Sequence, residues 1–196
     1  MFIQVIQGKC TRHDELRAMA DGWREELGGG AVGWLGGTYG ITDDDDFIGV
    51  IRFESREAAM ANSERPEQTA WAEKMMGLMD GPVEFHDCDD VMLFMEGGSD
   101  QAGFVQVIEG KVDDPSRIKA MLADTTMLHE MRPEIIGGTL AIEADGSFIE
   151  TVAFRDEDSA REGEKTPPPP EVASELESMM VGARFYDLHD PWFESA

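Results

Sequence analysis

The chain has little cysteine, little histidine and no long apolar run. Its 196 residues include 2 cysteines and 4 histidines. Two cysteines cannot make the disulfide framework of a small secreted domain, so the sequence predicts a protein of the reducing cytoplasm. The start of the chain enters a strand pattern without the basic and apolar stretches of a signal peptide, which favours the same location. No stretch is long and apolar enough to span a bilayer.

Positive charge is also scarce. Sixteen lysines and arginines stand against 41 aspartates and glutamates, and the formal net charge is −25. Such a surface repels phosphate backbones and anionic lipid headgroups, so we expect neither nucleic acid nor a membrane as a partner. The acidic run at residues 43–46 lacks the alternating ligands and central glycine of a calcium loop, and we interpret it as a solvated turn.

Several motifs with defined chemistry are missing. There is no Walker-type loop, dinucleotide-binding glycine pattern or nucleophile elbow. His86-Asp87-Cys88 has the residue types of a metal site. On a strand, however, Asp87 would point away from the other two, and no second ligand cluster of recognised spacing follows. We therefore predict no metal and no bound cofactor.

The chain does contain an internal repeat. The segment at residues 2–9, FIQVIQGK, returns at residues 104–111 as FVQVIEGK. Gly36-Gly37-Thr38 returns as Gly137-Gly138-Thr139, and Met75-Met76 as Met179-Met180. Order and spacing are kept, so the sequence predicts a duplicated domain of about a hundred residues per copy.

Each copy follows a β-α-β-β-α-β pattern. In the first copy, Thr11 with Asp14 resembles the capping box of a helix. Ser55 is a candidate cap for a short second helix, and Pro66 is suited to begin the next helical segment. Apolar and β-branched runs predict strands at residues 2–9, 34–42, 47–54 and 83–95.

The second copy repeats this plan. Asp114-Pro115 is suited to begin a helix and Asp145-Gly146 to form a hairpin turn. Residues 165–170 predict an extended polyproline stretch. We expect the first repeat at residues 1–96, a linker at residues 97–103 and the second repeat at residues 104–196.

The strands are more apolar than a sheet with one wet face requires. Residues 2–6, 47–53, 104–108 and 148–154 are nearly continuous apolar runs. The helices of one copy can cover one face of its sheet, so the second face needs another cover. We therefore predict an α+β chain of two ferredoxin-like repeats packed sheet to sheet within one polypeptide, which favours a monomer.

This organisation resembles the dimeric α/β-barrel superfamily, which includes the antibiotic-biosynthesis-monooxygenase-like domains. Residues 53–59, FESREAA, running into Asn62 and Trp71, resemble the passage from the third strand to the following helix in that family. Residues 33–36, GWLG, resemble its entry into the second strand. Residues 62–68 together with residues 85–88 are similar to a tandem actinobacterial group. The resemblance implies a pocket between sheet and helices, used in some members for cofactor-free oxygenation and in others for haem.

Four residues of the first repeat are candidates for catalysis. Asn62 and Trp71 match the pocket residues that the resemblance implies. Arg52 ends an apolar strand and is placed to steady an anion, and His86 is a candidate general base. Because Asn62, Trp71 and Arg52 have no counterparts in the proline-rich second copy, we expect a working pocket in the first half. Each residue also has a structural interpretation: a core tryptophan, a helix-ending asparagine, an ion-paired arginine and a structural histidine.

Two functions are consistent with these features. The first is a cofactor-independent, monooxygenase-like enzyme for a small aromatic or enolisable molecule. The second is a non-catalytic protein that binds a small molecule, haem included. A closed pocket of a few hundred Å³ around the four candidates favours catalysis. A first half filled by Trp23, Trp71 and methionines favours binding.

Overall fold

The computed structural model describes residues 1–196, except that residue 171 is described only as part of its helix. The chain forms two compact units, each built on a five-stranded antiparallel sheet. The strand order is β10-β2-β3-β1-β4 in the first sheet and β5-β7-β8-β6-β9 in the second. The fold is therefore α+β, and the two sheets share one topology, as the repeat predicts.

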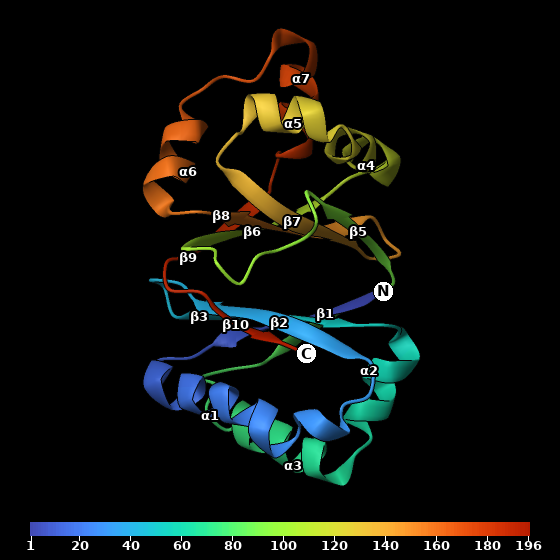
Figure 1. Cartoon of the computed structure of the whole chain (residues 1–196), viewed down its shortest axis with the longest axis vertical. Coiled ribbons are helices and arrows are strands. Elements are labelled where there is room, and N and C mark those ends of the chain that lie inside the picture. The colour runs from blue at the N-terminus through green and yellow to red at the C-terminus, as the bar shows by residue number, and fades with distance from the viewer. The chain divides into compact units, whose positions relative to one another are not determined.

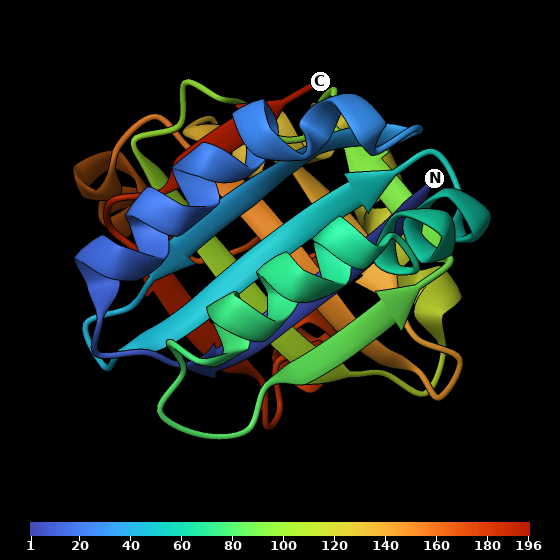
Figure 2. The ribbon, with the colours of Figure 1, turned by 90° about the horizontal axis from the view of Figure 1, so that it is seen from below.

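The first unit contains most of the first repeat. Its strands are β1 (Phe2–Lys9), β2 (Trp34–Ile41), β3 (Asp46–Phe53), β4 (Glu84–Cys88) and β10 (Trp192–Ser195), and its helices are α1 (His13–Glu26), η1 (Gly28–Gly30), α2 (Arg56–Ser63) and α3 (Pro66–Met76). Figures 1 and 2 show α1 and α3 side by side over one face of this sheet. The core that positions the first candidate residues lies between these helices and the sheet.

The second unit has the same plan with an additional short helix. Its strands are β5 (Asp90–Phe94), β6 (Phe104–Lys111), β7 (Ile135–Ile142), β8 (Ser147–Phe154) and β9 (Arg184–Leu188), and its helices are α4 (Pro115–Ala123), α5 (Thr125–Met131), α6 (Glu157–Glu164) and α7 (Pro170–Met179). These helices lie over one face of the sheet (Figure 1). The proline-rich stretch ends where Pro170 begins α7.

Several predicted helix starts are confirmed. The Ser55 side chain accepts a hydrogen bond from Ala58 N, and Asp114 accepts one from Ser116 N. The capping box at Thr11 is wrong. Arg12 is the N-cap residue of α1 and makes no side-chain cap, while the Thr11 hydroxyl donates to Asp80 Oδ2 at 2.9 Å. The Thr11 side chain therefore bonds Asp80, a residue distant in the chain, instead of capping the helix.

The expected fourth strand at residues 83–95 is two strands in two sheets. β4 pairs with β1 in the first sheet, whereas β5 pairs with β7 in the second. At the other end of the chain, β10 returns to pair with β2 in the first sheet. Each sheet thus takes one edge strand from the end of the other repeat.

The compact units consequently differ from the sequence repeats. The first comprises Met1–Asp89 with Trp192–Ala196, and the second comprises Asp90–Pro191. The expected linker at residues 97–103 lies inside the second unit, between β5 and β6. A hydrophobic pattern identifies a strand but not the sheet that it joins, so the repeat boundary at residue 96 misses this exchange. The expected packing of one sheet on the other stays a prediction.

Candidate functional site

Two of the four predicted site residues line a small cavity in the first unit. Asn62 at the end of α2 and Trp71 in α3 contribute to the wall of a space of about 80 Å³. Asn62 is buried, and its Oδ1 accepts a hydrogen bond of 2.9 Å from Arg65 Nη1. Trp71 also packs against two clusters of buried hydrophobic residues in the first unit. Asn62 and Trp71 therefore line the same cavity, and their part in a reaction stays a prediction.

Arg52 and His86 project from the opposite face of the sheet. Ile51 and Phe53, the strand neighbours of Arg52, line the cavity under the helices, so strand alternation turns Arg52 away. The neighbour of His86, Asp87, bonds Gln4 of the cavity wall, which turns His86 away as well. The four candidates do not share one pocket, because the sheet separates two of them from the other two.

The first unit is closely filled beneath its helices. The Trp23 and Trp34 rings meet edge to face with centroids 4.9 Å apart. Trp23 Nε1 donates to Gln68 Oε1 at 2.7 Å, and Met75 is buried beside them. This arrangement leaves little room for a substrate.

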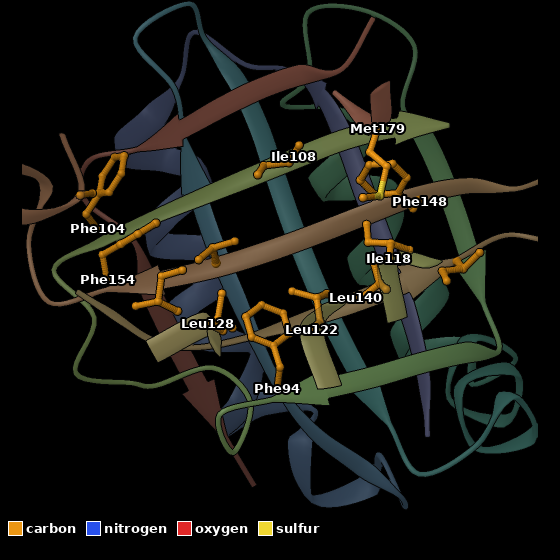
Figure 3. Close-up of a cluster of buried hydrophobic side chains, with 14 residues drawn as sticks. Phe94, Phe104, Ile108, Ile118, Leu122, Leu128, Leu140, Phe148, Phe154 and Met179 are labelled. Carbon is orange, nitrogen blue, oxygen red and sulfur yellow. The ribbon is translucent and has the colours of Figure 1, made fainter. Parts of the chain in front are cut away.

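A larger cavity, of about 520 Å³, lies in the second unit. Figure 3 shows part of the surrounding core, where Ile118, Phe148 and Met179 lie together and Phe94, Leu122 and Leu128 form a second group. The apolar wall of the cavity comes from the sheet and from α4, α5 and α7: Ile108, Met121, Leu122, Met127, Leu128, Met131, Ile135, Val152, Phe154, Leu176, Met179 and Met180. The size is that of a site for a small organic molecule.

The proline-rich segment forms part of this wall. Thr166, Pro167, Pro168 and Pro169 line the cavity before Pro170 begins α7. The larger cavity thus lies in the second half of the chain, while the expectation of a working pocket in the first half stays a prediction. Proline cannot continue a helix or donate a backbone hydrogen bond, so the segment bridges α6 and α7 as irregular chain.

Glu150 is the buried carboxylate of this cavity. It lies on β8 between Phe148 and Val152 on the face covered by the helices, and it is 7% exposed. Among the described residues, none gives its carboxylate a hydrogen bond. Burial raises the pKa of Glu150 to about 7, and the nearby charge of Arg132 only partly offsets this. A carboxylate with this pKa can accept and release a proton near neutral pH.

Arg132 supplies a positive charge to the same wall. Its Nε donates to Glu134 Oε1, and its guanidinium carbon lies 5.7 Å from the centre of the Phe154 ring. Gly163 of α6 lies against this pair, since a Cβ there would overlap the Glu134 carboxylate. Arg132 thus lines the cavity while Glu134, which does not line it, binds its Nε.

Gln106 adds a polar group on β6. Its Nε2 donates to Asp187 Oδ1 at 2.9 Å, which fixes the amide plane at the edge of the cavity. Gln4, its counterpart in the first repeat, makes the equivalent hydrogen bond to Asp87 Oδ1.

Sequence reasoning missed Glu150, although a signal was present. Residues 148–154 read FIETVAF, and a single acid inside such an apolar strand is unusual because burial penalises its charge. The equivalent position in the first repeat, Gly49, carries no side chain. The comparison of repeats that singled out Asn62 and Trp71 would have singled out Glu150 as well.

Within the part of the chain that the structure describes, no three His, Cys, Asp or Glu side chains are grouped to hold a metal ion. In the same part, no helix has the length and apolar character needed to cross a bilayer.

Solved structures provide the comparison that identifies the fold. A proposed monooxygenase from Fusobacterium nucleatum superposes with a TM-score of 0.74 at 11% identity, covering 99% of this chain and 94% of that one. An anthrone oxidase-like protein gives 0.69 at 8% identity over 100% and 93%. A ferredoxin-fold protein from Listeria monocytogenes, related to antibiotic biosynthesis monooxygenases, gives 0.52 at 12% identity over 95% and 94%.

The chain has the ferredoxin-like fold of the antibiotic-biosynthesis-monooxygenase-like proteins. These likenesses extend over nearly the whole chain, so the monooxygenase-like fold includes both units. Comparison with family models found no match, and neither did comparison with curated proteins. At such low identity the likeness concerns the fold, and the function has to be argued from the cavity itself.

Proposed function

We propose that the second unit is a cofactor-independent oxygenase whose cavity binds a small, apolar, enolisable aromatic molecule, with Glu150 as the general base. One observation carries this proposal: a buried carboxylate, to which none of the described residues donates a hydrogen bond, lies on the wall of a largely apolar cavity of about 520 Å³. Burying such a group is costly, and a substrate that brings an acidic proton to it offsets that cost.

The surroundings of Glu150 match the requirements of a base. The raised pKa leaves a substantial fraction of Glu150 ionised at neutral pH and makes it a stronger base than an exposed glutamate. Glu150 is 7% exposed, so its carboxylate is little solvated, which strengthens its interaction with a bound substrate.

The reaction can be written for a substrate with an acidic CH₂ group next to conjugated rings. Glu150 removes one proton, and the electron pair remains on carbon as an enolate-like anion. The anion gives one electron to O₂, the two radicals combine into a carbon–oxygen bond, and protonation yields a hydroperoxide. Loss of water, with the second hydrogen of the CH₂ group, leaves a ketone. The balance is one CH₂ and one O₂ converted to one C=O and one H₂O.

Two polar groups are placed to orient the anion. The Arg132 guanidinium lines the cavity and is positively charged, so it stabilises negative charge as this develops on the substrate oxygen. Gln106, held by Asp187, presents a second polar edge. Both are fixed by partners within the protein and need little reorganisation during the reaction.

The names of the neighbours support the choice of test substrate. One is an anthrone oxidase-like protein, and anthrone carries a CH₂ group between two aromatic rings. The experiment is O₂ uptake with anthrone, corrected for spontaneous oxidation, for the wild type, Glu150→Gln and Glu164→Gln. Glu164 also lines the cavity but is bound by Arg161.

We expect Glu150→Gln to reduce kcat by roughly 10²- to 10⁴-fold, and Glu164→Gln to change it little. In the wild type, kcat/KM should rise with pH up to about 7 and then level, because the base must be deprotonated. Equal rates for the two variants, or no uptake above the spontaneous rate, would contradict the proposal.

Binding without catalysis is the second candidate. The close packing of Trp23, Trp71 and Met75 around the small cavity favours it for the first unit. If Asn62 and Trp71 have a function, we propose that it is to bind a very small molecule, and that Arg52 and His86 act elsewhere. Saturable binding of a ligand that Asn62→Ala abolishes, without O₂ uptake, would support this function.

We further propose that the chain acts as a monomer in the cytoplasm and binds neither nucleic acid nor membranes. The strand exchange builds both sheets from one polypeptide, which supports a monomer. The net charge of −25 supports the absence of nucleic-acid and membrane binding. Light scattering at increasing protein concentration tests the monomer, since a constant mass of 21.7 kDa is expected.

A further inference from the structure

The wall of the large cavity is rich in methionine. Of the chain's 13 methionines it carries Met121, Met127, Met131, Met179 and Met180, whereas the small cavity of the first unit has Met75. We propose that these five thioethers are a modification site, at which hydroperoxides bound in the cavity are reduced and methionine sulfoxide is formed. The proposal rests on the proposed function for the source of the hydroperoxide, but not for the site itself.

The geometry gathers these sulfur atoms around one space. Met127 and Met131 are one helical turn apart on α5, so both project from the same face of that helix. Met179 ends α7 and Met180 follows it, and Met179 is 7% exposed. An apolar hydroperoxide that enters the cavity is therefore surrounded by thioethers supplied by α4, α5 and the end of α7.

Other easily oxidised side chains are absent from this wall. Among its described residues there is no cysteine, tryptophan, tyrosine or histidine. Cys10 and Cys88 both belong to the first unit and are buried, and burial raises the pKa of the Cys10 thiol. A thiol held in its protonated form is a poor nucleophile, so Cys10 does not compete with the thioethers, and Cys88 is fully buried in the first unit.

The chemistry is a two-electron transfer of one oxygen atom. The sulfur lone pair attacks the terminal peroxide oxygen, the O–O bond breaks and an S–O bond forms. Sulfur is oxidised, the hydroperoxide is reduced to an alcohol, and the hydroperoxide proton ends on the new hydroxyl group. The product is a sulfoxide, which is polar where the thioether was apolar. Accumulated sulfoxides make the wall less favourable for an apolar ligand, so we expect weaker binding after oxidation.

The test compares two oxidants by peptide mass spectrometry. Hydrogen peroxide is small and polar, whereas cumene hydroperoxide is apolar and fits a cavity. Met1, Met60 and Met76 are the reference sites, since they are 47%, 48% and 41% exposed. We expect hydrogen peroxide to oxidise these three first and cumene hydroperoxide to oxidise the five cavity methionines first. The same order with both oxidants would overturn the proposal.

The Glu150→Gln variant separates this inference from the proposed function. With cumene hydroperoxide, it should oxidise its cavity methionines as the wild type does. With anthrone and O₂, sulfoxide should form in the wild type and not in the variant. If anthrone yields no sulfoxide while cumene hydroperoxide keeps its preference, the site stands and the proposed reaction fails. If cumene hydroperoxide does not oxidise the cavity methionines before the exposed ones, the proposed modification site is wrong, regardless of the result with anthrone.

Discussion

Gln106 Nε2 donates a hydrogen bond of 2.9 Å to Asp187 Oδ1 and thereby joins β6 to the edge strand β9. Asp187 also pairs with Arg161 of α6, whose guanidinium carbon lies 5.1 Å from the centre of the Phe104 ring. One carboxylate thus connects β6, the edge strand β9 and a helix of the second unit.

The first unit contains the same arrangement. Gln4 donates to Asp87 Oδ1 at 2.8 Å, Asp87 pairs with Arg56 of α2 at 3.3 Å, and Arg56 lies 4.8 Å from the centre of the Phe2 ring. The Phe, Gln and Asp recur at equivalent strand positions, and in each unit an arginine of the following helix reaches the aspartate, so we interpret the arrangement as structural. Gln106 therefore helps to shape the cavity wall rather than to react.

The first prediction concerns this aspartate. Replacing Asp187 by Asn removes a charged acceptor from both Gln106 and Arg161, so we expect the free energy of unfolding to fall by about 1 kcal/mol. Asp158→Asn is the control, because Asp158 is an exposed aspartate on α6, the helix that carries Arg161. Urea unfolding of both variants is the measurement. An equal change in the two would mean that Asp187 contributes no more than an ordinary surface charge.

The second prediction concerns the pH dependence of stability. The pKa of Glu150 is raised from 4.5 to about 7 in the folded protein, so the folded state binds its proton more tightly. The contribution of Glu150 is therefore complete below pH 4.5, is lost as pH rises to about 7, and stays level above. Glutamine does not titrate, so the Glu150→Gln variant keeps its stability as pH rises. At pH 8 its free energy of unfolding should exceed that of the wild type by up to roughly 3 kcal/mol. Urea unfolding at pH 5 and pH 8 measures the difference, and a difference independent of pH would contradict a buried carboxylate.

The third prediction tests the strand exchange. Trp192 of β10 stacks on Tyr39 with ring centroids 5.9 Å apart, and Arg17 lies 5.2 Å above the Trp192 ring. Trp192→Ala should destabilise the first unit by about 3–5 kcal/mol, because it empties a buried site in that core. Hydrogen exchange should accelerate in β2, the partner of β10. Phe185→Ala is the control, since Phe185 is 52% exposed, and protection of β2 that is unaffected by Trp192→Ala would argue against the exchange.

The fourth prediction concerns two helical glycines. A Cβ at Gly22 of α1 meets its nearest neighbour, Glu26 Oε1, at an ordinary 3.7 Å, so Gly22→Ala should stabilise by about 1 kcal/mol. At Gly163 a Cβ would displace the Glu134 carboxylate from Arg132, so we expect that gain to be lost. The released Arg132 would lower the pKa of Glu150 further and shift the activity profile to lower pH. Thermal unfolding of both variants measures the first effect, and similar gains at the two positions would count against it.

Much of the fold was predictable because its signals are local. The Ser55 and Asp114 caps depend on neighbouring backbone amides, and the strand runs depend on alternation along a few residues. The capping box failed where a distant residue, Asp80, competed for Thr11. The resemblance assigned Asn62 and Trp71 to one pocket, and both line the same cavity. The face of the sheet on which Arg52 and His86 lie depends on strand register, which the sequence does not give.

The amino-acid sequence by itself determined the duplicated α+β plan, the apolar strands and the strongly acidic character of this protein. Tertiary structure decided that β5 and β10 join sheets that their own repeats do not supply, and that the larger cavity lies in the second unit. The physical reason is the range of the interactions involved. Strand and helix preferences act between neighbours, but the sheet that a strand joins, the volume of a cavity and the pKa of Glu150 depend on groups that are distant in the chain.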